Sequence, residues 1–202
     1  MRGCVIAGIG TGVGKTLTAA IFAQRHAADY WKPVQAGDLA NTDSHTVKAL
    51  VPDVQHIHPE AYRLTAPMSP HAAAAIDGVR IELEHLRLPA TPRFLVVELA
   101  GGLMVPLHSR LTNLDLVSHW QLPVVLVASY YLGSINHTLL SVDALLHRKV
   151  DIAGLVFNGE TNFSSRSVIL ERTGLDCLLE LPHVPRVDTA FISTCAARLE
   201  EF

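Results

Sequence analysis

The nine residues GIGTGVGKT, from Gly8 to Thr16, constrain this chain more than any other stretch. The ending Gly-Lys-Thr is that of a phosphate-binding loop; a short apolar run precedes it and a helical pattern follows it. Strand, glycine-rich turn and helix is the context in which backbone N–H groups and a helix dipole hold a phosphate. The spacing is unusual, because five residues rather than the usual four separate Gly8 from Gly14. The stretch is therefore either a modified nucleotide site or a tight turn that happens to end in Lys-Thr.

Two observations favour the nucleotide site. From average residue usage, a chance match to this pattern is expected in on the order of 1% of chains of this length, and here the match directly follows the first apolar run. In such a loop Lys15 reaches the β- and γ-phosphates of a nucleotide, and the hydroxyl of Thr16 binds Mg²⁺. The loop residues predicted to hold the nucleotide are Gly12, Val13, Gly14, Lys15, Thr16 and Leu17.

Apolar runs alternate with helical patterns along the chain, which is typical of βα units and a mostly parallel sheet. The runs FLVVEL (94–99) and LPVVLVAS (122–129) are continuously apolar, so helices are expected on both faces of the sheet. We therefore predict a single three-layer α/β domain of the P-loop NTPase type over residues 1–202. The other expected strands are 3–8, 29–34, 152–159 and 177–181; the expected helices are 15–28, 41–50, 69–76, 134–149, 164–173 and one from Asp188, with a loop over 51–70.

Three of these helices carry recognisable start signals. Asn41 or Thr42 is the expected cap of the helix over 41–50, because short polar side chains satisfy free N–H groups at a helix start. Pro70 suits the first helical position, where its missing N–H has no consequence. Ser134 is the expected cap of the helix over 134–149.

Charge and cysteine content narrow the possible partners. The net charge of −3 provides no basic surface, so nucleic acid is not an expected partner. Three cysteines lie far apart without a C-x-x-C pair, which argues against zinc or disulfides and fits a reducing cytoplasm. The eleven histidines are scattered and form no metal-binding motif. The charge-free span 116–142 contains proline, glycine and polar residues, so no membrane segment is expected, and no signal peptide is recognised.

Two charged residues are expected at the carboxyl ends of strands, where open α/β sheets bind their ligands, and a third, Asp43, is a further candidate. Glu98 ends a strand that is predicted to be buried on both faces, and a carboxylate there is costly unless it has a partner. Lys32 follows the second strand and Asp43 lies in the motif NTD. Taken singly, Asp43 is also explained as a helix cap, and Lys32 as a side chain that extends to solvent.

Seven motifs, in chain order, resemble the dethiobiotin synthetase family: GIGTGVGKT, YWKPVQAG, NTD, SPH, VVELAGG, LPVVLV and LGSINH. The resemblance covers nearly the whole chain through Asn158 and is weak beyond it. The loop of this family also has five residues between its outer glycines, so the unusual spacing is a family trait. The resemblance implies ATP-dependent closure of a cyclic urea: 7,8-diaminopelargonate takes up CO₂ as a carbamate, ATP activates it as a carbamic–phosphoric anhydride, and the second amine displaces phosphate to give dethiobiotin.

The resemblance implies roles for the residues at the strand ends. Lys15 and Lys32 would flank the carbamate and the γ-phosphate and stabilise the negative charge of the transition state, with Thr11 beside them. Hard oxygen ligands suit Mg²⁺, a hard cation. The implied Mg²⁺ ligands are Thr16, Asp43 and Glu98.

The same resemblance implies contacts to the nucleotide and the diamine. Asn158 matches an asparagine that reads adenine, since an amide both donates to and accepts from a base edge. The further implied nucleotide contacts are Leu99, Ala100, Gly101, Gly159, Pro182, His183 and Val184. The implied diamine contacts within one subunit are Thr11, Lys32, Ala36 and Gly101.

A homodimer is the third implication, with the diamine in a cleft at the subunit interface. The carboxylate tail of the diamine would meet a helix start in the motif LGSINH of the second subunit, and a helix N-terminus favours an anion. From the residues alone, the segment is equally consistent with a plain strand-to-helix turn. The residues concerned are Gly133, Ser134, Ile135 and Asn136.

The chain departs from the family pattern at five positions. Gly10 and Gly12 stand where acids are common, and Tyr131 stands where a lysine is common. Ala36 lacks a hydroxyl, which removes one hydrogen bond to the diamine worth about 1 kcal/mol. Leu99 replaces a glycine and is expected to crowd the backbone near the phosphates. None of the departures affects the two lysines or the implied metal ligands.

Two other functions are compatible with a phosphate loop. A dimeric partitioning or metallocluster-scaffold ATPase uses nucleotide to drive association, but its loop carries an early lysine, whereas no lysine precedes Lys15 here. A catalytically inactive relative would hold nucleotide or a partner protein without turnover. The departures at Ala36 and Leu99 favour that alternative, and the intact Lys15, Lys32, Asp43 and Glu98 argue against it.

Overall fold

A seven-stranded sheet forms the centre of the computed structural model, which describes residues 2–200. All neighbouring strands in it are parallel, which confirms the expected sheet type. In spatial order the strands are β11 (Cys177–Leu181), β10 (Ile152–Asn158), β9 (Val124–Ser129), β1 (Gly3–Gly8), β6 (Leu95–Gly102), β2 (Asp29–Trp31) and β4 (His56–His58).

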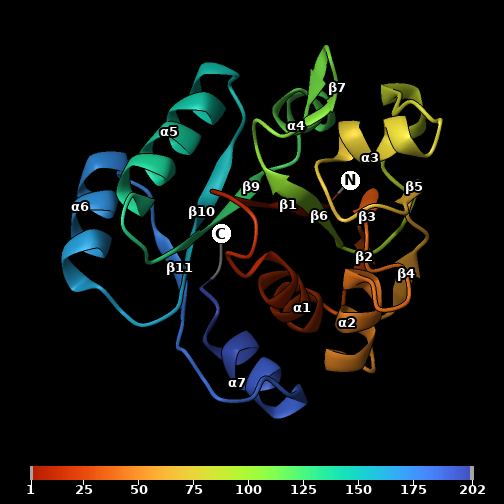
Figure 1. Cartoon of the computed structure of the whole chain (residues 1–202). Coiled ribbons are helices and arrows are strands. Elements are labelled where there is room, and N and C mark those ends of the chain that lie inside the picture. The colour runs from red at the N-terminus through yellow and green to blue at the C-terminus, as the bar shows by residue number, and fades with distance from the viewer. Residues whose placement is uncertain (1, 201–202) are drawn as a thin grey trace.

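Helices cover both faces of this sheet (Figure 1). Along β1, Cys4 and Ile6 pack into one buried cluster, while Val5 and Ala7 pack into the other. Both faces are therefore apolar, as the continuous apolar runs predicted. On the Cys4 face lie α1 (Lys15–His26), α2 (Asp43–Leu50) and α7 (Thr189–Arg198); on the other lie α3 (Pro70–Ile76), α4 (Asn113–Trp120), α5 (Ser134–His147) and α6 (Phe163–Thr173).

Several short elements were not expected from the sequence. The expected loop over 51–70 contains β4 and also β5 (Tyr62–Leu64), so that expectation was wrong in part. The expected strand over 29–34 ends at Trp31; after Pro33, which has no N–H for the ladder, β3 (Val34–Ala36) pairs with β5 instead. Helix α4 was also not predicted. The remaining elements are β7 (Pro106–His108), β8 (Leu111–Thr112) and the 3₁₀ turn η1 (Leu83–His85).

The helix starts agree with the expectations in two cases and differ in one. Thr42 caps α2, because its side chain accepts a hydrogen bond from the N–H of His45, and Pro70 is the first residue of α3. Ser134 is not the cap of α5: Gly133 holds that position in a left-handed conformation with φ of 103°. Ser134 is instead the first helical residue, and it is buried. The left-handed cap excludes most side chains, which explains why a glycine precedes the serine.

Two general expectations can be compared with the part of the chain that the structure describes. Within residues 2–200, no helix combines the length and apolar character needed to span a membrane. Cys4, Cys177 and Cys195 are free thiols, as their spacing indicated.

The carboxyl ends of β1, β6 and β2 lie side by side in the sheet, and the loops that leave them form one edge of the molecule.

Candidate active site

The glycine-rich loop connects β1 to α1, and this strand–loop–helix context was predicted from the sequence. No side chain caps the start of α1, so its first N–H groups are available to an anion. Gly14 occupies the cap with φ of 101°, and a Cβ built there would lie 2.5 Å from Nδ2 of Asn158. That amide nitrogen donates a hydrogen bond of 3.0 Å to the carbonyl of Val13. Only glycine fits this approach between the loop and the end of β10.

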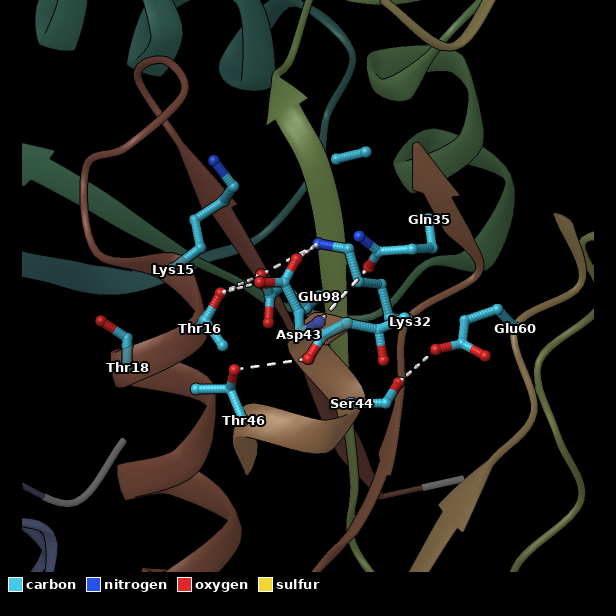
Figure 2. A network of polar contacts seen from close by, with 12 residues as sticks. Lys15, Thr16, Thr18, Lys32, Gln35, Asp43, Ser44, Thr46, Glu60 and Glu98 are labelled. Carbon is cyan, nitrogen blue, oxygen red and sulfur yellow. Dashed lines mark hydrogen bonds and ion pairs between the residues drawn. The ribbon is translucent and has the colours of Figure 1, made fainter. Parts of the chain in front are cut away.

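Lys15 is buried at the start of α1. Its ammonium donates a hydrogen bond of 2.7 Å to the carbonyl of Gly10, and Figure 2 shows the side chain turned away from the carboxylates of Asp43 and Glu98. Burial lowers the pKa of Lys15 to about 8, although the negative charge of Glu98 acts in the opposite direction. A phosphate bound in the loop would supply the counter-charge that this lysine lacks.

Four charged or polar side chains meet below the loop (Figure 2). The ammonium of Lys32 lies 2.6 Å from Oδ2 of Asp43 and 3.1 Å from Oε1 of Glu98. The hydroxyl of Thr16 lies 3.0 Å from Oδ1 of Asp43 and 2.8 Å from Oε1 of Glu98 and can donate to one of them at a time. Residues from α1, from α2, from the middle of β6 and from the position after β2 thus converge on one point. They come from four separate motifs of the sequence.

The environment of this cluster keeps the lysine and the aspartate charged. Burial alone would lower the pKa of Lys32, but the charges of Glu98 and Asp43 raise it above its ordinary value. Burial alone would raise the pKa of Asp43, but the charge of Lys32 holds it below the ordinary value of a carboxyl group. Lys32 is therefore not the solvent-exposed side chain that was one interpretation of the sequence, since it is almost fully buried.

Tyr30 is a residue of this cluster that the sequence did not reveal. It lies in the middle of β2, is completely buried, and donates a hydrogen bond of 2.8 Å to Oε2 of Glu98. Burial and the negative charge of Glu98 both raise the pKa of Tyr30 well above its ordinary value, so the phenol keeps its proton. The only signal in the sequence was a hydroxyl group within a short buried strand, where a partner is needed.

A cavity of about 730 Å³ opens between the loop, the cluster and the ends of β3 and β6. Ala36 lies at its wall, so the cavity has no hydroxyl at that position. Sequence reasoning assigned no role to several residues that also line the wall: Gln35, Asp38, Val105 and the segment 67–70. Gln35 belongs to the motif YWKPVQAG, and the end of the segment belongs to the motif SPH. The predicted site residues that line it are Thr11, Gly12, Gly14, Lys15, Thr16, Leu17, Lys32, Ala36, Asp43, Glu98, Ala100 and Gly101.

The other predicted site residues lie outside the lining of this cavity. Val13 is buried behind the loop, and the side chain of Leu99 packs into the core on the face of α3 to α6. The crowding expected from Leu99 therefore does not arise, because successive residues of a strand point to opposite faces. Gly133 and Ile135 line a separate cavity of about 560 Å³, and Ser134 is buried next to it. The remaining ones end β10, follow β10 or β11, or lie on α5: Asn136, Asn158, Gly159, Pro182, His183 and Val184.

The donor set of the cluster fits Mg²⁺. One hydroxyl and two carboxylates provide hard oxygen ligands, and in the structure the ammonium of Lys32 supplies the positive charge between the carboxylates. Within residues 2–200, the cluster included, the histidines, cysteines and acids form no group of three or more that could hold a metal ion, because the cluster contains two carboxylates and a hydroxyl. The scattered histidines are thus without a common site within the described residues.

Comparisons with solved structures identify the fold. A putative plasmid partition protein from Borrelia burgdorferi B31, solved with AMPPNP bound, superposes with a TM-score of 0.61 at 13% identity and covers 98% of this chain and 95% of its own. A ParA family ATPase from Chlorobium tepidum TLS superposes with a TM-score of 0.59 at 13% identity over 97% of both chains. At this low identity the likeness extends to the fold alone, and it confirms the predicted P-loop architecture.

Comparisons of sequence identify the family. A family model described as an AAA domain matches residues 2–190. An ATP-dependent dethiobiotin synthetase BioD from Christiangramia forsetii is 44% identical over 97% of this chain and 95% of its own length. A second BioD, from Nitrobacter hamburgensis, is 49% identical over 89% of this chain and 85% of its own. The chain therefore belongs to the family of ATP-dependent dethiobiotin synthetases.

Proposed function

We propose that this chain closes the ureido ring of dethiobiotin in the cavity between the phosphate loop and the end of β6. The observation that carries the proposal is the convergence of Lys15, Lys32 and three oxygen donors in one cavity. A switch ATPase also has the loop, but its structural likeness to this chain is restricted to the fold. Residues 1–202 would act as one catalytic domain, and free thiols are compatible with a reducing cytoplasm.

The proposed reaction has three steps. One amine of 7,8-diaminopelargonate attacks CO₂ and loses a proton, which gives a carbamate. A carbamate oxygen then attacks the γ-phosphorus of ATP, the bond to the bridging oxygen breaks, and ADP leaves. The second amine attacks the carbonyl carbon of this anhydride and loses a proton, and phosphate leaves with an oxygen that came from the carbamate. The products are dethiobiotin, ADP and phosphate.

The two lysines would stabilise the negative charge of the phosphoryl-transfer transition state. Lys15 starts from a position 2.7 Å from the carbonyl of Gly10 and would exchange that partner for phosphate oxygens. Lys32 starts between Asp43 and Glu98 and would turn its ammonium towards the carbamate. Thr11, which lies on the loop at the wall of the cavity, would contact the same group. These exchanges concern side-chain atoms only, since the residues are held by β1, β2 and α1.

Thr16, Asp43 and Glu98 would hold Mg²⁺, which supplies charge neutralisation for the phosphates when it is bound. The proposal is supported by the hydroxyl of Thr16, which lies within hydrogen-bond distance of both carboxylates. Binding of Mg²⁺ by this cluster would also give Lys32 a second function. Before nucleotide arrives, the ammonium keeps the two carboxylates together; afterwards it is free to bind the carbamate.

The purine and the diamine would extend from the ends of this cavity. Asn158 lies beside the loop, since it donates to the carbonyl of Val13, and we propose that the purine lies against it and the segment 182–184. Gly101 and Ala36 line the cavity itself, and we propose that the diamine lies against them. The missing hydroxyl at Ala36 would weaken the binding of the diamine and would leave the reacting groups unaffected.

A homodimer would complete the substrate site. The segment 133–136 lies outside the main cavity of its own chain, so its proposed contact with the carboxylate of the diamine requires a second subunit. Leu132 beside it is fully exposed, and Leu140 and Leu146 are exposed along α5. Apolar side chains on one surface helix support a subunit contact there.

The release of ADP from Mg·ATP and bicarbonate, with and without 7,8-diaminopelargonate, tests the proposed function. We expect release that depends on the diamine, together with an equal amount of dethiobiotin. Slow release that is indifferent to the diamine would instead indicate a switch ATPase. Nucleotide binding with no release in either case would indicate an inactive relative.

A further inference from the structure

The two oxygens of Glu98 have different surroundings. Oε1 faces the loop, where the hydroxyl of Thr16 lies 2.8 Å away and the ammonium of Lys32 lies 3.1 Å away. Oε2 faces the interior of the sheet and accepts the hydrogen bond of 2.8 Å from Tyr30. Glu98 is 1% exposed, so the carboxylate cannot turn towards solvent to exchange these partners. Only Oε1 is directed at the proposed metal site.

The strand register explains how Tyr30 reaches this position. In the parallel pair of β2 and β6, Tyr30 lies opposite Val96. Glu98 is two residues further along β6 and so points to the same face as Val96. The long phenol ring spans that distance within the core under α1 and α2, where Tyr30 is completely buried. The hydroxyl is thus held by the packing of the ring, which leaves it little freedom to release Oε2.

This arrangement matters for the choice of metal ion. Mg²⁺ takes near-octahedral coordination and uses one oxygen of a carboxylate, whereas Ca²⁺ accepts six to eight oxygens and readily takes both oxygens of a carboxylate. We propose that Tyr30 is a positioning residue for metal selectivity: by holding Oε2, it restricts Glu98 to one-oxygen ligation and favours Mg²⁺ over Ca²⁺. The inference rests on the proposed role of Glu98 as a metal ligand.

The test measures metal binding directly. Mg²⁺ and Ca²⁺ are titrated against Mn²⁺ in the complex of the full chain with ADP, with protein in excess, and bound Mn²⁺ is followed by electron paramagnetic resonance. Tyr30→Phe removes one oxygen and keeps the ring. Loss of such an outer partner typically weakens metal binding about 10-fold or more. In Tyr30→Phe we expect the affinity for Mg²⁺ to fall by about that factor. The affinity for Ca²⁺ should fall less or should rise, so that the preference for Mg²⁺ decreases.

Tyr62→Phe is the matched control. The hydroxyl of Tyr62 accepts a hydrogen bond from the N–H of Glu82, and neither residue is a proposed metal ligand. Both variants are expected to lose some thermal stability, but only Tyr30→Phe should change the ratio of the two metal affinities. If the ratio in Tyr30→Phe equals that of the wild type, Tyr30 is a structural residue and the inference is wrong.

Glu98→Gln separates this inference from the proposed metal site. If Glu98→Gln weakens the binding of both ions while Tyr30→Phe leaves the ratio of the two affinities unchanged, the proposed metal site is supported and the role of Tyr30 is refuted. If Glu98→Gln changes neither affinity, Glu98 is not a ligand, and both proposals are overturned. If both variants act as expected, the selectivity originates in the hydrogen bond to Oε2.

Discussion

Replacing Lys32 by methionine should destabilise the nucleotide-free protein strongly. The substitution keeps an apolar side chain of similar length and removes the ammonium that lies between Asp43 and Glu98. Two carboxylates would then face one another with only hydroxyl donors beside them. Removing one partner of a buried ion pair costs about 3–5 kcal/mol, because a charge is left buried without its counter-charge.

The burial of each partner sets the expected size of the effect. The side chain of Lys32 is 5% exposed and that of Glu98 is 1% exposed, whereas that of Asp43 is 34% exposed and therefore partly screened by water. We accordingly expect the lower part of the range, about 3 kcal/mol. For a domain of this size, about 1 kcal/mol shifts the unfolding midpoint by roughly 2–4 °C, so the midpoint should fall by roughly 6–12 °C.

Thermal and urea unfolding without nucleotide measure this loss. Lys48→Met is the matched control, because Lys48 is exposed and donates a hydrogen bond to the carbonyl of Pro52; it should change stability by less than about 0.5 kcal/mol. Added Mg²⁺ should restore part of the stability of Lys32→Met, since the cation replaces the missing charge. A loss below about 1 kcal/mol would refute the reasoning that Lys32 neutralises this pair.

Four further predictions concern the loop and its ligands. Lys32→Ala should abolish ring closure and leave nucleotide binding largely intact; undiminished turnover would remove Lys32 from the mechanism. Glu98→Gln should raise the Mg²⁺ concentration needed for half-maximal turnover, and an unchanged metal titration would argue against ligation. The pKa of Lys15 is about 8 in the folded chain and about 10.5 as an ordinary lysine, so the unfolded chain binds more protons between pH 8 and 10.5. The free energy of unfolding without nucleotide should therefore rise with pH over this range. Lys15→Met should remove this pH dependence. Gly14→Ala should destabilise the protein and weaken nucleotide binding, because a Cβ would lie 2.5 Å from Nδ2 of Asn158; calorimetry that shows wild-type affinity would contradict this.

The sequence predicted the main architecture because the signals for it are local. Continuous apolar strands, helical patterns and a glycine-rich turn each act over a few residues, and the structure confirms the parallel sheet covered on both faces. Lys32 could also be placed, since it follows an apolar strand whose carboxyl end must reach the ligand-binding edge of the sheet. Glu98 was expected at a strand end, and this was wrong in part: it reaches the cluster, but β6 continues past it to Gly102. Thr42 was recognised as one of two candidate caps for the same reason.

What the sequence did not predict depends on contacts between distant segments. The partnership of Tyr30 with Glu98 follows from the strand register, which no local pattern encodes. The pairing of β3 with β5 joins short segments that have too few residues for a periodic signal. Ser134 has the chemistry of a helix cap, but the left-handed Gly133 takes that position. The homodimer, the metal ligation and the purine contacts stay predictions.

Transfer of oxygen from bicarbonate to phosphate tests the proposed mechanism most directly. In the anhydride, one carbamate oxygen becomes bonded to the γ-phosphorus and leaves with phosphate, while the other stays in the urea carbonyl. The reaction is started with ¹⁸O-labelled bicarbonate, ATP and 7,8-diaminopelargonate. It is stopped before the bicarbonate exchanges its label with water, and the phosphate is then analysed by mass spectrometry. We expect one labelled oxygen in each phosphate formed together with dethiobiotin. Unlabelled phosphate formed alongside dethiobiotin would show that the carbamate is not phosphorylated, and the proposed mechanism would be wrong.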